Sequence, residues 1–341
     1  MSMPEPLVAS PSSPTAGSGA ESARRRLAGR MPVLQIAALV VLYLVGQAAI
    51  DGYGSESSLL SMLVLASFLG IAAAGQTFAV LLGGIDLSVP FLIGAGNVLA
   101  SQLSGGNHWP FAVVVGFIAI LALFVGAANG YISHRFEIHP LIVTLGVGSM
   151  VGGGVLVWTH ARLTGSAPAW LGSFVSPGGN VAGVGIPPVI LLWAGVAVVV
   201  VVVLSKTGAG RRLYATGANP EGARLALVNT TRVWTGAFAA SGLCAAMAGV
   251  LLAGFSGTGL FEIGTPYLFT TIASVVIGGT SLLGARGDYL RTVLGALILT
   301  EITTLLIGME LSTAMQQAVL GAIILVVVAT YAREPHVRNR I

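Results

Sequence analysis

The chain has 341 residues, of which 55% are hydrophobic and only 8% are charged. A soluble domain has about 25% charged residues, so these few charges could not cover the surface of a soluble protein of this size. The apolar residues come in runs of about 20, long enough to cross a hydrocarbon core of about 30 Å and longer than the strands of a membrane barrel. The composition therefore predicts an all-α polytopic membrane protein. The net charge of +4 is no evidence for a nucleic-acid partner, because the basic residues flank the apolar runs.

The chain divides into a long apolar region between two polar ends. Residues 1–30 contain much Pro, Ser, Ala and Gly and four arginines, which is typical of a disordered tail. Residues 31–331 form the predicted transmembrane domain, and residues 332–341 form a C-terminal tail. Within the domain we expect ten membrane-spanning segments, at about residues 31–50, 58–82, 87–103, 110–132, 140–159, 188–204, 233–254, 267–283, 292–308 and 313–331.

The basic residues predict the orientation of these segments. If the N-terminus is cytoplasmic and the segments alternate, all but one of the 16 Lys and Arg residues lie on the cytoplasmic side, and only Arg162 lies outside, as the positive-inside rule requires. The outer loops then carry the acidic residues Asp51, Glu56, Glu262 and Glu310. Both tails and the long loop 205–232 are expected in the cytoplasm.

Segments 87–103 and 267–283 are weaker than the others because they are short and contain Pro, Gly, Ser or Thr. Removing one of them from the count would place the charged C-terminus outside. Interrupted segments of this kind often line a substrate pathway, where irregular backbone is tolerated. Ten segments is therefore the preferred count, and the sequence leaves open whether these two span fully or re-enter.

The cytoplasmic loop 205–232 contains a local helix signal. Asn219 is a good N-cap, Pro220 suits the first helical position, and Glu221 favours the positive end of the helix dipole. The residues that would then give a short helix with much apolar surface are Ala223, Leu225, Ala226, Leu227 and Val228. Such a helix either docks a partner protein or lies flat on its own membrane domain. The other long loop, residues 160–187, is expected outside. It fits a cap over the pathway, a docking surface for an external protein or a simple linker.

The sequence shows no catalytic site. It has no H-E-x-x-H motif, a single cysteine (Cys244), and five scattered histidines, so we expect no metal site, no disulfide and no cofactor. It also has no P-loop. The protein is therefore predicted not to be an enzyme, and uphill transport would use an ion gradient or a separate ATPase. The candidates for ion coupling are few: Asp86 at a segment edge, and Glu301, which neighbouring Thr300 or Thr303 could satisfy.

Asp86 lies in the stretch LLGGIDLSVP, between two apolar segments. At the cytoplasmic end of the second segment a buried charge is not required. Asp86 is expected to cap a helix that starts at about Leu87, accepting a backbone N–H. The alternative is direct contact with a transported sugar, if Gly83 and Gly84 let the turn reach the pathway.

Four motifs in order resemble a known family: GGIDLSVP (83–90), NGYISHRFEIHPLIVTLG (129–146), GANPEGARLALVN (217–229) and SVVIGGTSLLGARG (274–287). They are similar to the permease subunits of ABC importers for ribose and related monosaccharides, over about residues 58–330. The resemblance implies a ten-span permease in the bacterial cytoplasmic (inner) membrane, surrounded by lipid and paired with a second permease copy or a homologous permease. Its partners would be a cytoplasmic ATP-binding subunit and an extracytoplasmic sugar-binding protein.

The resemblance also places functional residues. It implies that the following residues couple to the ATPase: Gly217, Asn219, Pro220, Glu221, Ala223, Leu225 and Leu227. The family motifs give these pathway candidates: Gly83, Gly84, Asp86, Ser88, Asn129, Pro140, Thr144, Gly278, Gly279 and Thr280. Two positions depart from the family pattern. Residues 226–228 replace a Ser-Gly-Ile-like turn, and Pro90 stands where a glycine is usual.

The favoured function is the permease of an ATP-driven, binding-protein-dependent importer of ribose or a related small polar solute, working by alternating access. The first alternative is an ion-coupled secondary transporter of a small polar solute. The second is a membrane-embedded enzyme, for which no polar catalytic cluster is found. The sequence does not name the solute, and autoinducer, nucleoside and polyol importers share the architecture.

Overall fold

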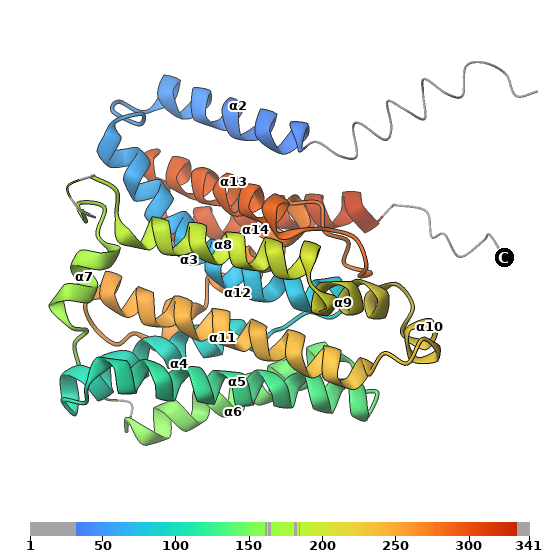
Figure 1. Cartoon of the computed structure of the whole chain (residues 1–341). Helices are drawn as coiled ribbons and strands as arrows, with labels where there is room; N and C mark the ends of the chain where they lie inside the picture. Colours follow the sequence, from blue (N-terminus) through green and yellow to red (C-terminus); the bar gives the residue numbers. More distant parts are fainter. Residues whose placement is uncertain (1–31, 161, 163–164, 181–182, 184, 333–341) are drawn as a thin grey trace, which may run out of the picture.

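The computed structural model describes residues 32–160, 162, 165–180, 183 and 185–332, and Figure 1 shows the arrangement of their helices. The predicted tail 1–30 lies outside the described residues, as does the predicted tail 332–341 apart from its first residue, which ends α14. Every named element of the described part is helical: α2 (Val33–Ala49), α3 (Glu56–Leu81), α4 (Val89–Ser101), the π-helical turn η1 (Gln102–Gly106), α5 (Phe111–Arg135), α6 (Pro140–Trp158), α7 (Ala169–Val175), α8 (Pro188–Lys206), α9 (Gly208–Ala218), α10 (Pro220–Leu225), α11 (Thr230–Ser256), the 3₁₀ turn η2 (Phe261–Gly264), α12 (Tyr267–Ile277), α13 (Tyr289–Gly308) and α14 (Thr313–Ala332).

The helices agree with the predicted apolar segments. Each of the ten segments overlaps one of the helices α2, α3, α4, α5, α6, α8, α11, α12, α13 and α14. Among the described residues, six helices are long and apolar enough to cross a membrane, namely α3, α5, α6, α8, α11 and α13, and shorter apolar helices accompany them. The prediction of an all-α polytopic membrane protein is thus confirmed.

The α-helices in the two weak segments are shorter than a membrane span. Helix α4 has 13 residues and α12 has 11, which correspond to about 20 Å and 17 Å, less than a hydrocarbon core of about 30 Å. The second predicted segment was placed at 267–283, but its helix ends at Ile277, and residues 278–288 form a loop. Glycines Gly278 and Gly279 end this helix because Gly279 adopts a positive φ of 84°.

Helices α3 and α11 form the centre of the bundle. About two-thirds of the apolar window of each is buried, compared with 22 to 28% for α5, α6 and α8. Helix α4 is also almost completely buried, and it packs along α11 through small residues: Gly249 faces the carbonyl of Ile93, and Gly96 faces the carbonyl of Ala246. Small residues at such contacts let helices approach closely in a membrane, where no hydrophobic effect drives them together.

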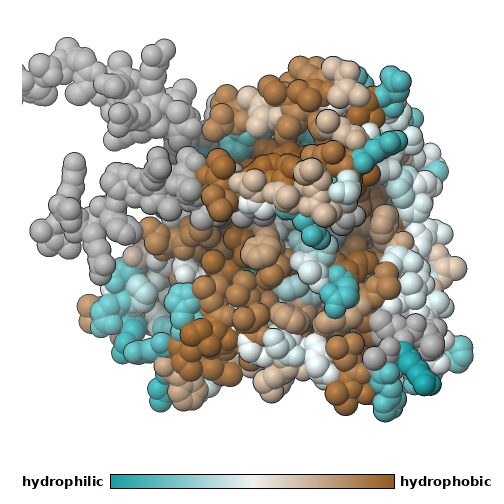
Figure 2. Space-filling view, turned by 180° about the vertical axis from the view of Figure 1, so that it is seen from behind, coloured by the Kyte–Doolittle hydropathy of each residue, from teal (hydrophilic) through white to brown (hydrophobic). Residues whose placement is uncertain are grey.

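The bundle has two distinct ends. Helices α9 and α10 project at one end, and α7 together with the α2–α3 turn lies at the other (Figure 1). We call these the α10 end and the α7 end. The described basic residues gather at the α10 end, in α9, α10, the loop before α13 and the adjoining helix termini, while Arg162 precedes α7 at the other end. Figure 2 shows mostly hydrophobic residues between two more hydrophilic ends, with a smaller hydrophilic group inside the hydrophobic zone.

Candidate functional site

A cluster of buried polar groups surrounds the turn between α3 and α4. The Oδ1 atom of Asp86 accepts hydrogen bonds from the backbone N–H of Ser88 at 2.9 Å and from the Ser88 hydroxyl at 2.5 Å. The Nδ2 atom of Asn129, on α5, donates to the same hydroxyl at 3.0 Å. The backbone N–H of Leu87 donates to the Thr144 hydroxyl on α6 at 2.9 Å. The turn is therefore tied to two neighbouring helices immediately before α4 begins.

Helix α3 adds a further tie from the other side. In the amide orientation that satisfies both groups, Gln76 donates to the carbonyl of Asp86 and accepts from its N–H, each at 3.2 Å. These contacts complete the backbone hydrogen bonding of a residue that lies outside any helix, which is necessary where no water is available. Gln76 was not among the residues expected from the sequence, because a polar side chain inside an apolar helix gives no sign of its partner.

The structure corrects the prediction for Asp86 in two respects. The helix begins at Val89 instead of Leu87, so Asp86 satisfies the N–H of Ser88, the residue before the helix, and does not cap the helix directly. The side chain is also not at a surface, because Asp86 is only 1% exposed. The expectation that it accepts a backbone N–H is confirmed.

The cluster lies well inside the bundle. The Asp86 carboxylate is close to Ser241 on α11, which is 11 residues after the start of that 27-residue helix. At about 1.5 Å per residue this is about 17 Å along a helix of about 40 Å. Within the described structure, Asp86 Oδ2, Asn129 Oδ1 and Ser241 Oγ have no hydrogen-bond partner. The turn therefore re-enters the bundle from the α10 end and carries unsatisfied polar atoms with it.

A second set of predicted residues lies nearer the α10 end. Thr280 is fully buried and its hydroxyl has no partner in the described part of the chain. Gly278 packs against the backbone of α13 at Arg291 and Thr292. The carbonyl of Pro140 accepts from the Thr144 hydroxyl at 2.8 Å, which places Pro140 with the Asp86 cluster. The predicted pathway residues thus separate into two groups, one around Asp86 and one around the 278–288 loop.

Three backbones meet where these groups join. The N–H of Ala285 donates to the carbonyl of Leu81, the last residue of α3, at 2.9 Å. Gly217 of α9 lies against the same carbonyl so closely that a Cβ atom there would overlap it, and a Cβ at Gly284 would lie 3.1 Å from it. Gly83 follows with a positive φ of 78° and faces the carbonyl of Leu283. We call Leu81, Gly217, Gly284 and Ala285 the backbone junction. It connects α9 to the turn that carries Asp86.

The predicted helix after Asn219 is present but shorter than expected. The Asn219 side chain accepts from the N–H of Gly222 at 2.9 Å, Pro220 occupies the first turn, and Glu221 pairs with Arg224 at 3.5 Å. Helix α10 ends at Leu225, so the expected continuation to residue 228 is wrong.

The chain turns after α10 because Leu227 has a positive φ of 60°. Leu225 and Leu227 are 79% and 94% exposed, while Ala223 is buried. The expected apolar surface is therefore present, and it faces away from the protein's own membrane domain. The alternative of a helix lying flat on that domain does not hold for these two leucines.

Glu301 is not satisfied in the way the sequence suggested. The Thr303 hydroxyl donates to the carbonyl of Leu299, and Glu301 Oε2 has no partner among the described residues. Glu301 lies at the edge of an apolar cavity of about 340 Å³ between α2, α3 and α13. It stands apart from the Asp86 cluster, so the two carboxylates do not form a relay.

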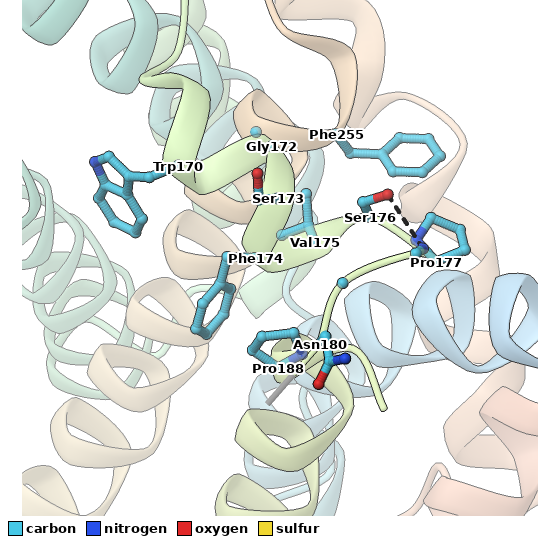
Figure 3. Close-up of a pocket in the computed structure, with 13 residues that line it drawn as sticks. Trp170, Gly172, Ser173, Phe174, Val175, Ser176, Pro177, Asn180, Pro188 and Phe255 are labelled. Atoms are coloured by element: carbon cyan, nitrogen blue, oxygen red, sulfur yellow. Dashed lines mark hydrogen bonds between the residues drawn. The ribbon is translucent and has the colours of Figure 1, made fainter. Parts of the chain in front are cut away.

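Residues 160–187, which the sequence analysis placed in an outer loop, contain the short helix α7. An open pocket of about 810 Å³ lies between α7, residues 176–180 and the end of α11. In Figure 3 the rings of Trp170 and Phe174 project from α7 on one side of the view, and Phe255 lies on the other. Trp170 is 54% exposed and packs edge to face on Phe111, with ring centroids 4.9 Å apart. The α7 end thus offers a hollow with aromatic side chains and backbone polar groups.

Comparison with known proteins identifies the family. The family model described as "Branched-chain amino acid transport system / permease component" matches residues 58–328, from α3 to α14. The ribose import permease protein RbsC of Haemophilus influenzae is 30% identical over 294 residues, which cover 85% of this chain and 90% of RbsC. RbsC of Bacillus subtilis is 32% identical over 280 residues, 80% of this chain and 83% of that protein.

The autoinducer 2 import system permease protein LsrC of Shigella flexneri is 31% identical over 296 residues, 86% of this chain and 85% of LsrC. No solved structure matches the chain. The predicted resemblance to sugar-importer permeases is confirmed. The prediction that the protein is a transport subunit and not an enzyme agrees with this family. The chain belongs to the importer permease family whose model is described as the permease component of the branched-chain amino acid transport system, and it is a multi-pass membrane protein.

Proposed function

We propose that the protein translocates ribose, autoinducer 2 or a closely related hydroxyl-rich solute as the membrane subunit of an ATP-driven importer. The observation that carries this proposal is the similarity to ribose and autoinducer 2 permeases along 80 to 86% of the chain. The family description mentions branched-chain amino acids, but the similar curated relatives import sugar-like solutes. We therefore place the solute among small neutral molecules that carry several hydroxyl groups.

We further propose that the α10 end faces the cytoplasm. The clustering of basic residues at this end and the single Arg162 near the other support that orientation under the positive-inside rule. Ten apolar segments would then place both termini in the cytoplasm. Segments α4 and α12 are too short to cross alone, so each would cross together with the irregular stretch before it, residues 82–88 for α4 and residues 257–266 for α12.

Helix α10 is the proposed contact for a cytoplasmic ATPase. An importer permease of this family implies an ATPase and a solute-binding protein as partners. The exposed Leu225 and Leu227 give the ATPase two apolar anchors on a rigid, capped turn. Exposed apolar side chains at a water-facing end usually mark an interaction site.

The backbone junction provides a route from α10 into the bundle. Helix α9 leads directly into α10, and Gly217 near its end touches the last carbonyl of α3. Displacement of α10 by the ATPase would therefore shift Leu81 and the turn that carries Asp86. Alternating access needs such a rigid connection, since a packed contact transmits displacement only if no gap or soft side chain absorbs it.

The hollow beside α7 is the proposed docking region for the solute-binding protein. Its open shape and exposed Trp170 suit a protein surface better than a small ligand. A second permease, identical or homologous, would complete the translocation pathway. These assignments rest on family membership together with the geometry of the two ends.

Reconstitution tests the proposal. The permease, its ATPase and its binding protein are placed in vesicles, and uptake of labelled ribose, autoinducer 2 and a branched-chain amino acid is measured with and without ATP. Uptake of a hydroxyl-rich solute that needs ATP and the loaded binding protein is expected. Uptake driven by an ion gradient without the ATPase would overturn the proposal in favour of a secondary transporter. ATP-driven uptake of the amino acid alone would overturn the solute class.

A further inference from the structure

The segment between α11 and α12 folds into the bundle instead of remaining in an outer loop. Gly259 lies beside Val98 and Ser101, and the N–H of Leu260 donates to Asn97 Oδ1 at 2.6 Å. The chain then continues down α4, because Phe261 contacts Gly94 and Gly264 lies against the carbonyl of Pro90. The segment thus descends along 11 residues of α4, or about 16 Å. Glu262, which the sequence analysis placed in an outer loop, lies on a segment that packs along α4.

Gly264 allows this close approach. A Cβ atom at residue 264 would overlap the Pro90 carbonyl and approach the N–H of Gly94. The start of α12 and the start of α4 consequently lie close together, deep in the bundle. Two re-entrant segments meet there, one entering from the α10 end through Asp86 and the other from the α7 end through Glu262. Irregular backbone at this depth is tolerated where it borders protein or water.

Glu262 is exposed although it lies at this depth. Both Glu262 and Thr265 are exposed in the single chain, and the Thr265 hydroxyl donates to Glu262 Oε2 at 2.9 Å. Phe269, the third residue of α12, is 58% exposed. A carboxylate that faced lipid here would be strongly unfavourable, and intramembrane acids almost always face a bundle interior or a water-filled path. Lipid is therefore the least favourable neighbour for this face, and a water-filled path is a favourable one.

The Glu262 carboxylate can accept hydrogen bonds from the hydroxyl groups of a solute. Glu262 is the second residue of the 3₁₀ turn η2, five residues before the start of α12. No ion pair to it occurs in the described part of the chain, so a passing solute can use the carboxylate as an acceptor. The exposed ring of Phe269, seven residues farther along the chain, offers an apolar face for the C–H side of a sugar. An anionic solute would be repelled by the carboxylate, because no ion pair within the described residues neutralises it.

We propose that Glu262, Thr265 and Phe269 form a solute-contact site in the translocation pathway that accepts neutral polyhydroxylated molecules and rejects anionic ones such as sugar phosphates. This inference rests on the proposed importer function. It assigns the middle of the pathway to the re-entrant 257–266 segment, a region outside all four family motifs. Asp86 then has a positioning role on the facing re-entrant turn, and Glu262 makes the contact.

Substitution of Glu262 is expected to lower solute uptake without changing the stimulation of ATP hydrolysis by the loaded binding protein. The variants Glu262→Gln and Glu262→Ala are compared with Glu310→Gln, a matched exposed glutamate in the turn between α13 and α14. In the reconstituted complex we expect both Glu262 variants to keep assembly and ATP hydrolysis stimulated by the loaded binding protein. Uptake of the neutral sugar should fall at least tenfold, while Glu310→Gln should behave as the wild type. Unchanged uptake in Glu262→Gln would overturn the proposal.

Thiol labelling tests the environment of residue 262 without relying on activity. A Glu262→Cys, Cys244→Ala protein in the complex should react with small hydrophilic thiol reagents, and millimolar neutral sugar should slow that reaction while the sugar phosphate should not. Reaction only with a lipid-soluble reagent would show that the face meets lipid and would overturn the proposal. Cross-linking between two copies with no hydrophilic labelling would show a protein contact and would also overturn it. If the wild-type complex itself shows no ATP-driven uptake, the importer function fails instead.

Discussion

Truncation of the two exposed leucines at the end of α10, Leu225 and Leu227, should detach the ATPase without unfolding the permease. The double variant Leu225→Ala, Leu227→Ala retains the Asn219 cap and the buried Ala223, so the turn itself should persist. Alanine keeps a Cβ atom at residue 227, where φ is 60°, so the backbone preference changes little. The substitution therefore removes apolar contact area and almost nothing else.

The exposed fractions set the size of the effect. Leu225 and Leu227 are 79% and 94% exposed in the free chain, so nearly all of their area is available for burial by a partner. Full burial of a leucine side chain contributes about 1.5–3 kcal/mol. Truncation of both to alanine should thus cost about 3 kcal/mol, or a hundredfold or greater loss of affinity at about 1.4 kcal/mol per tenfold. The stability of the isolated permease should hardly change.

The assay is co-purification and titration of the ATPase with the tagged permease in detergent, together with the thermal midpoint of the permease alone. The matched control is Met309→Ala at the α7 end, where an apolar side chain is 52% exposed; its ATPase affinity should equal that of the wild type. An affinity within twofold of the wild type in the double variant, with an unchanged thermal midpoint, would refute the coupling role of α10. A lowered thermal midpoint would refute the reasoning that these side chains pack on nothing in the permease.

Three further outcomes follow from the geometry. Asp86→Asn keeps an acceptor for the Ser88 N–H, so folded yield should stay near that of the wild type, whereas Asp86→Leu leaves that N–H and the Ser88 hydroxyl without their acceptor and should lower yield by more than half; equal yields of the two variants would contradict the positioning role. Gly217→Val should keep the permease–ATPase complex but abolish the stimulation of ATP hydrolysis by the loaded binding protein. The reason is that the valine side chain would push α9 away from α3. Normal stimulation would show that the backbone junction does not transmit motion. On a Cys244→Ala background, cysteine at the exposed Ser173 should react with an impermeant thiol reagent in whole cells and cysteine at the exposed Ala218 should not; the opposite pattern would reverse the orientation.

The sequence by itself determined what depends on neighbouring residues. The apolar runs predicted the ten helical segments, because segment length and hydropathy are local properties. The cap at Asn219 followed by Pro220 and Glu221 predicted the start of α10, since capping involves residues within one turn. The end of α10 was missed because the positive φ at Leu227 has no glycine to indicate it.

Only the tertiary structure decided the depth of the irregular segments. Asp86 and Glu262 both follow apolar runs, and such residues are most simply placed at a membrane surface. Their depth depends on what their backbone packs against: Gln76 and Ser88 for Asp86, and α4 for the segment that carries Glu262. The hydrogen bond from Asn129 to Ser88 joins residues 41 positions apart, and the approach of Gly264 to Pro90 joins residues much farther apart still. The hydropathy and capping pattern of a short stretch carries no information about such contacts. They form only when helices that are distant in the chain pack together and enclose the irregular segments that connect them.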